Sequence, residues 1–447
     1  MEFLGASQSV FDQMILLDVD QPGKASEAFE MSERSRARGL LDEFAPKSVN
    51  QQPSRPLSLD QIRAALPDNV TLLVYSVTSE RTHVFLVTRS DFRIASSPAT
   101  TRELERIVND YLAALRIRAP INELSQRARA LYELLIEPVR KWLASDTQLC
   151  IVPDKSLQLL PMAALKDGSD KFLVESFRLV FAPSASVFIR CLNEAEIART
   201  DERLLAVGDP SFNREKFPNL PGLDDARIET EGVSEFYSNP TVLTGTDALE
   251  ADVRAAMRNC NVAHLAAHCI VDQQSPWHSA LLLAPQEGST KTSINEVKKK
   301  QADVPVEPGK ANQDQLGRPQ VSFLPQTPKE DANDGLLYLN EIYNLKLPNT
   351  RLIVLSACET GLGPYYRGEG IVSLIHPFLA ARVSTVVASL WPVESRATSA
   401  LMTSFHKERR MSGLRAADAL RSAQLNMIVD SAHPYFWASF IVVGGNY

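Results

Sequence analysis

The stretch from Arg351 to Gly363, RLIVLSACETGLG, constrains the fold more than any other part of the chain. Its four apolar residues at 352–355 run directly into a turn of small residues that carries Cys358. A short apolar run bounded by glycines is typical of a buried parallel strand. In open α/β sheets, catalytic and binding groups lie just beyond the carboxyl ends of such strands. The Cys358 thiol is therefore either a nucleophile that faces a cleft or a small residue of the core.

From residue 203 onward, strand-like and helical stretches alternate. This alternation predicts an α/β fold with a mostly parallel sheet and helices on both faces. We expect Gly413 to break the chain between the last two helices. The expected strands are 204–208, 262–267, 352–357, 385–391 and 440–443, and the expected helices are 223–237, 247–258, 370–381, 395–410 and 414–428.

Residues 57–200 form a separate unit in this interpretation. Two runs rich in β-branched and aromatic residues, 71–77 and 82–88, predict a β-hairpin. Helical periodicity follows over 101–145. The one histidine of this region, His83, lies inside the hairpin. We therefore expect a non-catalytic α/β unit before a catalytic domain at 201–447.

The first 56 residues predict a helical arm and a linker. Residues 24–45 have apolar positions at helical spacing, and a polar, proline-containing stretch follows. The sequence pattern AFE-S-E-R-ARGLL resembles the closing helix of a tetratricopeptide array, but no second copy is visible at a period of about 34 residues. The region is either a remnant or docking arm of such an array, or a plain packing helix.

A long polar segment, 286–334, interrupts the predicted catalytic domain. It is rich in Lys, Gln, Pro and Asp, and Phe323 is its one aromatic residue. Such a composition buries too little apolar surface to order a chain, so we expect disorder. The segment is either an autocleavage or control site or a tolerated insertion.

Composition excludes several classes of protein. The net charge is -7 and the pI about 5.7, whereas nucleic-acid binding needs a basic face. No apolar run approaches the ~18 residues of a membrane helix, and the amino terminus lacks the pattern of a secretory signal. The chain has five cysteines and no C-x-x-C pair, which favours reduced thiols in a cytoplasmic protein.

A second apolar run lies within Asn261 to Cys269 and ends at His268. Because His264 lies within the expected strand, we interpret it as a structural residue. His268 lies at the carboxyl end, as Cys358 does after its own strand. If the two strands are neighbours, imidazole and thiol meet at one sheet edge, where the imidazole assists attack by the thiolate. Zinc binding by the two histidines and Cys269 is disfavoured, because residue 269 points to the opposite face of a strand.

Several blocks of sequence resemble the CHAT-domain family, a caspase-like branch of the clan that holds caspases, separases and gingipains. The resemblance covers 57–447 and places His268 and Cys358 on the family's catalytic dyad. The blocks are LCIVPDKSLQLLPMAAL with FAPSASV, HLAAHCIVDQQSPWHSALLLAP, DGLLYLNEIYNLKLPNTRLIVLSACETGLG with GEGIVSL, STVVASLWPVESRAT, and HPYFWASFIVVG.

This chain departs from the family pattern at three positions. Cys269 stands where the family usually has Gly directly after the histidine, and a positive φ there would be strained. Ser395 follows Glu394 where the family usually has a second acid. Arg382 stands where a Gly often follows the preceding helix.

The resemblance implies a cysteine endopeptidase that needs no metal and no cofactor. Backbone N–H groups of Cys269 and Cys358 are the candidate oxyanion donors. Asp272 and Glu359 lie beside the dyad in sequence, and each either orients the site or is a solvated acid. Glu369 and Glu394 are candidates for binding a basic substrate residue. The alternative is a caspase-like regulatory or scaffold module with little or no turnover.

Family members often carry helical repeats that sense a partner, and they resemble components of bacterial defence and programmed-death systems. The resemblance therefore implies a protein substrate, such as a gasdermin-like effector, and an activating partner protein.

Overall fold

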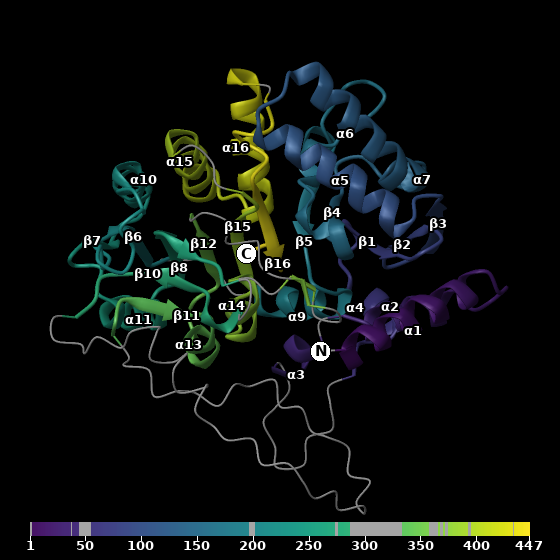
Figure 1. Ribbon diagram of the computed structural model, residues 1–447, viewed down its shortest axis with the longest axis horizontal. Helices are drawn as coiled ribbons and strands as arrows, with labels where there is room; N and C mark the ends of the chain where they lie inside the picture. Colours follow the sequence, from purple (N-terminus) through teal and green to yellow (C-terminus); the bar gives the residue numbers. More distant parts are fainter. Residues whose placement is uncertain are drawn as a thin grey trace, which may run out of the picture.

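An eleven-stranded sheet runs through the molecule, and seven of its ten neighbouring strand pairs are parallel (Figure 1). This confirms the predicted α/β class. The computed structural model describes residues 2–36, 38–43, 55–195, 202–272, 276–286, 333–356, 365–366, 370–371, 374–391, 395–431 and 433–447. In spatial order the strands are β3 (Phe92–Ser97), β2 (Thr82–Val87), β1 (Val70–Val77), β4 (Gln148–Val152), β5 (Arg178–Phe181), β16 (Phe440–Gly444), β15 (Thr385–Ser389), β12 (Leu352–Leu355), β8 (Val262–Ala266), β6 (Leu204–Pro210) and β7 (Thr241–Gly245).

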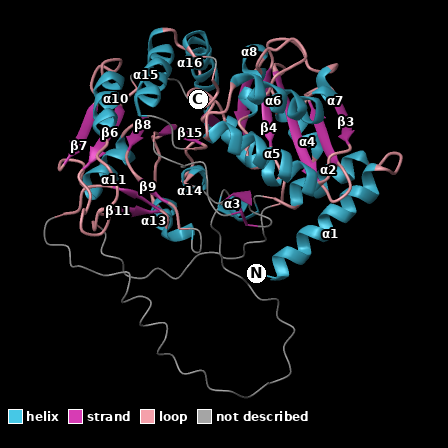
Figure 2. Cartoon of the chain, turned by 45° about the horizontal axis from the view of Figure 1, so that its top comes forward, coloured by secondary structure: helices cyan, strands magenta, loops and turns pink. Residues whose placement is uncertain are grey.

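Helices cover both faces of this sheet (Figure 2). Alternate residues of β1 enter two different cores: Leu73 and Tyr75 one, Leu72 and Val74 the other. The first core includes buried residues of α5 (Thr101–Arg116), α6 (Ile121–Leu135), α7 (Glu137–Arg140), α11 (Glu250–Asn259), α13 (Leu339–Asn344) and α14 (Ile375–Ala380). The second includes those of α2 (Ala25–Arg34), α4 (Leu59–Ala65), α10 (Asp224–Ser234), α15 (Ser395–Met411) and α16 (Ala416–Asp430).

The sheet continues between the two predicted units. β1 and β2 form the expected antiparallel hairpin, and β5 pairs with β16 through Phe181 and Val443. The division at residues 200 and 201 stays a prediction, since both lie outside the described residues. Strands β3, β5 and β7 were not expected, because β3 and β7 are part-exposed edges and β5 has only four residues.

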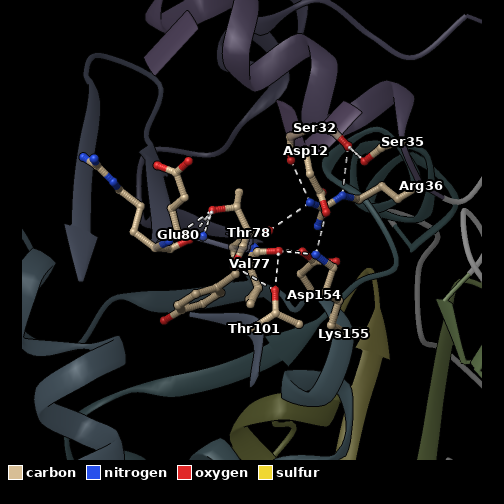
Figure 3. A network of polar contacts seen from close by, with 12 residues as sticks. Asp12, Ser32, Ser35, Arg36, Val77, Thr78, Glu80, Thr101, Asp154 and Lys155 are labelled. Atoms are coloured by element: carbon tan, nitrogen blue, oxygen red, sulfur yellow. Dashed lines mark hydrogen bonds and ion pairs between the residues drawn. The ribbon is translucent and has the colours of Figure 1, made fainter. Parts of the chain in front are cut away.

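The amino-terminal region packs on the sheet as three helices, where we expected one over 24–45. They are α1 (Glu2–Val19), α2 and α3 (Arg38–Glu43). The chain breaks between α2 and α3, where the guanidinium of Arg36 turns inward and donates to Tyr75 O at 2.8 Å. Figure 3 shows this contact region, in which Lys155 Nζ also reaches Asp12 Oδ2 at 2.8 Å. Its relation to a tetratricopeptide array stays a prediction.

The ends of the polar segment 286–334 are joined, although residues 287–332 lie outside the described part of the chain. The N–H of Gln286 donates to Asn333 O at 3.1 Å. Beside this contact, β10 (Ala280–Leu282) pairs with β11 (Leu336–Tyr338) and with β9 (Cys269–Ile270) in a small second sheet. Because residues 287–332 are not described, the expected disorder stays a prediction.

Two other expectations have mixed outcomes. The helix expected over 370–381 is shorter: α14 begins at Ile375, and Gly370–Ile371 instead form β14, which pairs with β13 (Tyr365–Tyr366). Gly413 separates α15 from α16 with a φ of +65°, as expected.

Candidate active site

The two strands that carry the candidate dyad are parallel neighbours. β8 pairs with β12 from Val262 opposite Leu352 to Leu265 opposite Leu355. The N–H of Ser356 then donates to Leu265 O at 3.0 Å, so the ladder extends to the end of the described strand. Parallel strands end at the same sheet edge, so the chain after both strands leaves from one place.

His268 marks the point where the chain leaves the main sheet. Two residues after the end of β8, its carbonyl accepts from Leu282 N at 2.9 Å, and Cys269 opens β9 of the small sheet. The residue is 8% exposed. Backbone bonds on both sides therefore hold it at the edge between the two sheets.

A backbone carbonyl orients the His268 ring. Nε2 lies 3.0 Å from Pro221 O. A carbonyl oxygen only accepts, so Nε2 carries the proton and, in the neutral ring, Nδ1 keeps the free lone pair. Phe212 supports the ring edge-to-face, with centroids 5.2 Å apart, and Arg214 stacks on Phe212 at 4.3 Å. Sequence reasoning missed Pro221 and Phe212, because loop residues have no periodic pattern.

A pocket adjoins His268 at the carboxyl ends of β8, β12 and β15 and at the amino end of β16. Its apolar lining includes Leu223, Trp391 and Phe440. Its polar lining consists of His268, a carboxylate and four hydroxyls, contributed by Glu229, Ser356, Ser389, Ser395 and Thr398. The pocket is therefore assembled from β8, β12, β15, β16, α10 and α15.

Helix α10 reaches this pocket because Gly208 lets it approach β6 closely. A Cβ at Gly208 would lie 2.8 Å from the carbonyl oxygen of Ala226. Thr230 Oγ1 is tied back to that same oxygen at 2.7 Å. Glu229, between them in sequence, is 2% exposed. Glu229 is a pocket residue that sequence reasoning missed, because it resembles any acid of a polar helix.

The predicted residues fall into two groups. Cys358, Glu359, Glu369 and Glu394 lie outside the described residues. Of the others, the N–H of Asp272 donates to Ser279 Oγ at 3.0 Å, and Asp272 is not part of the pocket lining beside His268.

The structure shows the backbone conformation at two of the positions where this chain departs from the family pattern. Cys269 pairs with Leu281 as part of β9 and is not among the described residues with positive φ, so replacing Gly there causes no left-handed strain. Arg382, in contrast, has a φ of +68°, the region that favours Gly.

His264 is buried in a chain of polar side chains behind the pocket. Its Nδ1 lies 3.2 Å from His406 Nε2, and His406 Nδ1 lies 2.9 Å from Tyr237 Oη. Its Nε2 lies 2.9 Å from Glu229 Oε1, although this approach lacks hydrogen-bond geometry. Burial, together with the charges of His264 and Arg409, holds the pKa of His406 well below its usual value. His264 is therefore a fully buried residue, as expected for a structural role, and it contacts the pocket residue Glu229.

Metal centres and membrane-spanning helices are two further features that would bear on function. No group of three or more His, Cys, Asp or Glu side chains in the described ranges is arranged to hold a metal ion. None of the helices that the structure describes has the length and apolar character needed to cross a membrane.

Part of the chain is similar in sequence to mammalian proteins. Tetratricopeptide repeat protein 28 of Homo sapiens is 27% identical over 358 residues, which is 71% of this chain and 13% of that protein. The Mus musculus protein of the same name is 27% identical over 343 residues, with the same shares. This chain therefore matches only a small part of the length of these relatives.

The fold is shared with a solved structure. The separase–securin complex of Saccharomyces cerevisiae aligns with 99% of this chain and 37% of its own, at 10% identity and a TM-score of 0.50. The Arg-specific cysteine proteinase gingipain R aligns with 74% of this chain and 68% of its own, at 8% identity and a TM-score of 0.36. The model of the CHAT domain matches residues 125–445. The fold is caspase-like, and the chain belongs to the CHAT-domain family.

Proposed function

We propose that the chain is a cysteine endopeptidase, with Cys358 as the nucleophile and His268 as the general base and acid. The observation that carries the proposal is the register of β8 and β12, which pairs residues whose numbers differ by 90. The numbers 268 and 358 differ by the same amount. Continued register would thus bring the dyad residues to one level at the sheet edge.

The geometry of His268 suits this chemistry. With Nε2–H bound to Pro221 O, Nδ1 is the nitrogen free to take the proton of a thiol. The thiolate attacks the peptide carbonyl carbon, and the imidazolium gives its proton to the leaving amine. Water then hydrolyses the thioester with the same imidazole as base.

The remaining roles belong to the same proposal. N–H groups of Cys269 and Cys358 stabilise the oxyanion. Asp272, Glu359, Glu369 and Glu394 are candidate substrate contacts, although Asp272 is not part of the pocket lining. Membership of the family supports a protein substrate, an activating partner protein and a role in bacterial defence or programmed death. A cytoplasmic location, where thiols stay reduced, is part of the same proposal.

Alkylation of the thiols tests the dyad without knowledge of the substrate. Burial raises the pKa of Cys191 to about 12 and of Cys260 to about 11, and raises that of Cys150 well above its usual value. These three thiols are inert internal references. We expect iodoacetamide to label Cys358 first at neutral pH, and His268→Ala to slow that labelling at least tenfold. Peptide mapping measures both.

Cleavage decides between enzyme and scaffold. Once cellular substrates are identified, Cys358→Ala and His268→Ala should each abolish their cleavage. Two results together would support the scaffold alternative instead. Cys358→Ala would leave the biological effect unchanged, and Cys358 would be labelled at the same rate in the wild type and in His268→Ala.

A further inference from the structure

The loop of residues 433–439 supports the candidate pocket from the amino end of β16. Trp391 lines the pocket and is 2% exposed. Its indole Nε1–H donates to Tyr435 O at 3.1 Å, and the N–H of Leu390 donates to Ser439 O at 2.8 Å. The place of the Trp391 ring in the pocket wall therefore depends on this loop.

His433 begins this loop and forms hydrogen bonds through both ring nitrogens. Nε2 lies 3.2 Å from Ala119 O, and the N–H of Tyr435 donates to Nδ1 at 3.2 Å. A carbonyl only accepts and a backbone N–H only donates, so the ring is neutral and carries its proton on Nε2. Burial lowers the pKa of His433 below its usual 6.5. The bond to Ala119 O opposes this effect, and the charge of Arg118 adds to it.

Ala119 lies in the turn between α5 and α6, outside the match to the CHAT-domain model at 125–445. Arg118, in the same turn, has a φ of +53°, a region that favours Gly. Its guanidinium carbon lies 5.4 Å from the ring centroid of Tyr435 and 5.9 Å from that of Phe436. The turn thus contacts the loop through a backbone carbonyl and through a side chain, and its strained backbone is typical of a functional position.

We propose that His433 is a positioning residue of the candidate active site, which holds Trp391 in the pocket wall and joins this wall to the α5–α6 turn. His433 acts through Tyr435 and is not part of the described pocket lining. The unit predicted to be non-catalytic thereby completes the site without supplying a reacting group. The consequence for substrate binding rests on the proposed peptidase function, whereas the position of Trp391 does not.

Protonation of His433 removes one of its two contacts. The imidazolium has an N–H on both nitrogens, so Nδ1 no longer accepts from Tyr435 N–H. Arg118 is the charged group that faces the ring from the α5–α6 turn, while Tyr435 and Phe436 face it from its own loop. We therefore expect the surroundings of Trp391 to change as the pH falls below 6.5.

Fluorine NMR of the full chain labelled with 5-fluorotryptophan measures this change directly. The chain has four tryptophans, and Trp391→Phe assigns the resonance of interest. Between about pH 7.5 and about pH 5, the Trp391 resonance of the wild type should shift with a midpoint below 6.5. Trp142 is the internal reference, because its ring contacts Lys141 and not this loop, and its resonance should not follow that midpoint.

Variants of His433 locate the effect. His433→Asn places a carboxamide oxygen near the position of Nδ1, so it accepts from Tyr435 N–H at every pH. Its Trp391 resonance should stay at the neutral-pH position throughout. His433→Ala has no acceptor and should give the shifted resonance even at neutral pH. His278→Asn is the matched control, because His278 is an exposed histidine outside this loop, and it should keep the wild-type titration.

Cleavage assays extend the test once a substrate is identified. His433→Ala should raise KM by about threefold to tenfold, as expected for one lost hydrogen bond, with a smaller effect on kcat. His433→Asn should restore the wild-type KM. Thermal unfolding checks that each variant is folded, and the wild-type titration needs no substitution at residue 433.

The outcomes separate the inference from the proposed function. A Trp391 resonance that does not titrate, an unchanged titration in His433→Asn, or a wild-type spectrum of His433→Ala would each overturn the inference. Cleavage with a KM that His433→Ala leaves unchanged would overturn it while supporting the peptidase. A titration of Trp391 that depends on His433, with no cleavage of any cellular protein, would support the positioning role and count against the peptidase.

Discussion

Nε2 of His268 lies 3.0 Å from the carbonyl oxygen of Pro221, and this contact decides which ring nitrogen acts as a base. Pro221 lies 47 residues upstream in a loop before α10, so the base depends on a segment outside its own strand. The edge-to-face contact with Phe212 is the second constraint on the ring.

Phe212→Ala should slow alkylation of Cys358 by up to about tenfold. The lost ring contact corresponds to about 0.5–1.5 kcal/mol, and 1.4 kcal/mol is tenfold in rate or affinity. The loss frees the imidazole to tilt away from the orientation set by Pro221. The measurement is the iodoacetamide rate at Cys358 between pH 5 and 9.

Phe212→Leu is the matched control, since it keeps apolar bulk without the edge-to-face geometry, and it should lie between wild type and Phe212→Ala. If Phe212→Ala labels Cys358 at the wild-type rate while remaining folded, the ring does not position His268.

The strand patterns predicted the part of the site that depends on sheet geometry. The apolar runs ending at His268 and before Cys358 were expected to be strands of one parallel sheet, and the structure adds that β8 and β12 are direct neighbours. The dyad itself stays a prediction. Glu229, Pro221 and Phe212 could not be predicted, because their positions depend on how a loop and a helix pack on the sheet. No sequence period encodes that packing.

The same distinction applies to the fold. Central strands such as β12 and β15 are buried on both faces and have continuous apolar sequences. The edge strand β7 is part-exposed and lacks that signal. The break between α2 and α3 was missed because Arg36 is typical of a helix in sequence, whereas here its side chain binds Tyr75 O.

Arg382→Gly should stabilise the protein by about 0.5–1 kcal/mol. Arg382 has a φ of +68°, a conformation that costs a non-glycine residue about 1–2 kcal/mol. Replacement by Gly relieves this strain, but the greater entropy of Gly in the unfolded state offsets about 0.5–1 kcal/mol of the stabilisation. The ion pair with Glu194, at 3.5 Å and with Arg382 57% exposed, contributes little. Urea unfolding measures the change.

Arg382→Ala separates the two effects, because it removes the ion pair and keeps the strain. We expect it to be about 1 kcal/mol less stable than Arg382→Gly. If Arg382→Gly is instead less stable than Arg382→Ala, the backbone conformation at residue 382 is not strained.

Glu250 should make folding stability fall as the pH rises from about 4.5 to about 7. Burial, followed by the charge of Glu341, raises the pKa of Glu250 from 4.5 to about 7, although Arg254 and the N–H of Gly335 act in the opposite direction. The folded state therefore holds this proton more tightly than the unfolded state. The contribution is fully present below about pH 4.5, is lost through pH 7, and is constant above.

Glu250→Gln should remove this dependence, as measured by urea unfolding at several pH values between 4 and 8. Glu231→Gln, on an exposed side chain, should keep the wild-type profile. A difference between wild type and Glu250→Gln that stays constant over this range would contradict the assigned titration.

Removal of residues 287–332 should leave the protein folded, with unchanged or higher stability. The two ends of the segment are already joined by the bond from Gln286 N to Asn333 O at 3.1 Å and by the pairing of β10 with β11. Gly335, with a φ of +85°, lies so close to Leu283 O that an added Cβ would be 2.8 Å away, which fixes the turn beside these contacts. In the deletion variant, an inserted Asn-Gly turn joins Gln286 to Asn333. Each halving of the loop length lowers the entropic cost of loop closure by about 0.6 kcal/mol.

Thermal unfolding and the alkylation rate of Cys358 measure the outcome of this deletion. A matched variant that also carries Gly335→Ala should unfold at a lower temperature, because it disturbs the joined ends. If the deletion alone lowers the melting temperature by many degrees, residues 287–332 make contacts on which the fold depends. If it leaves the melting temperature unchanged but abolishes labelling of Cys358, the segment acts on the site and is not a tolerated insertion.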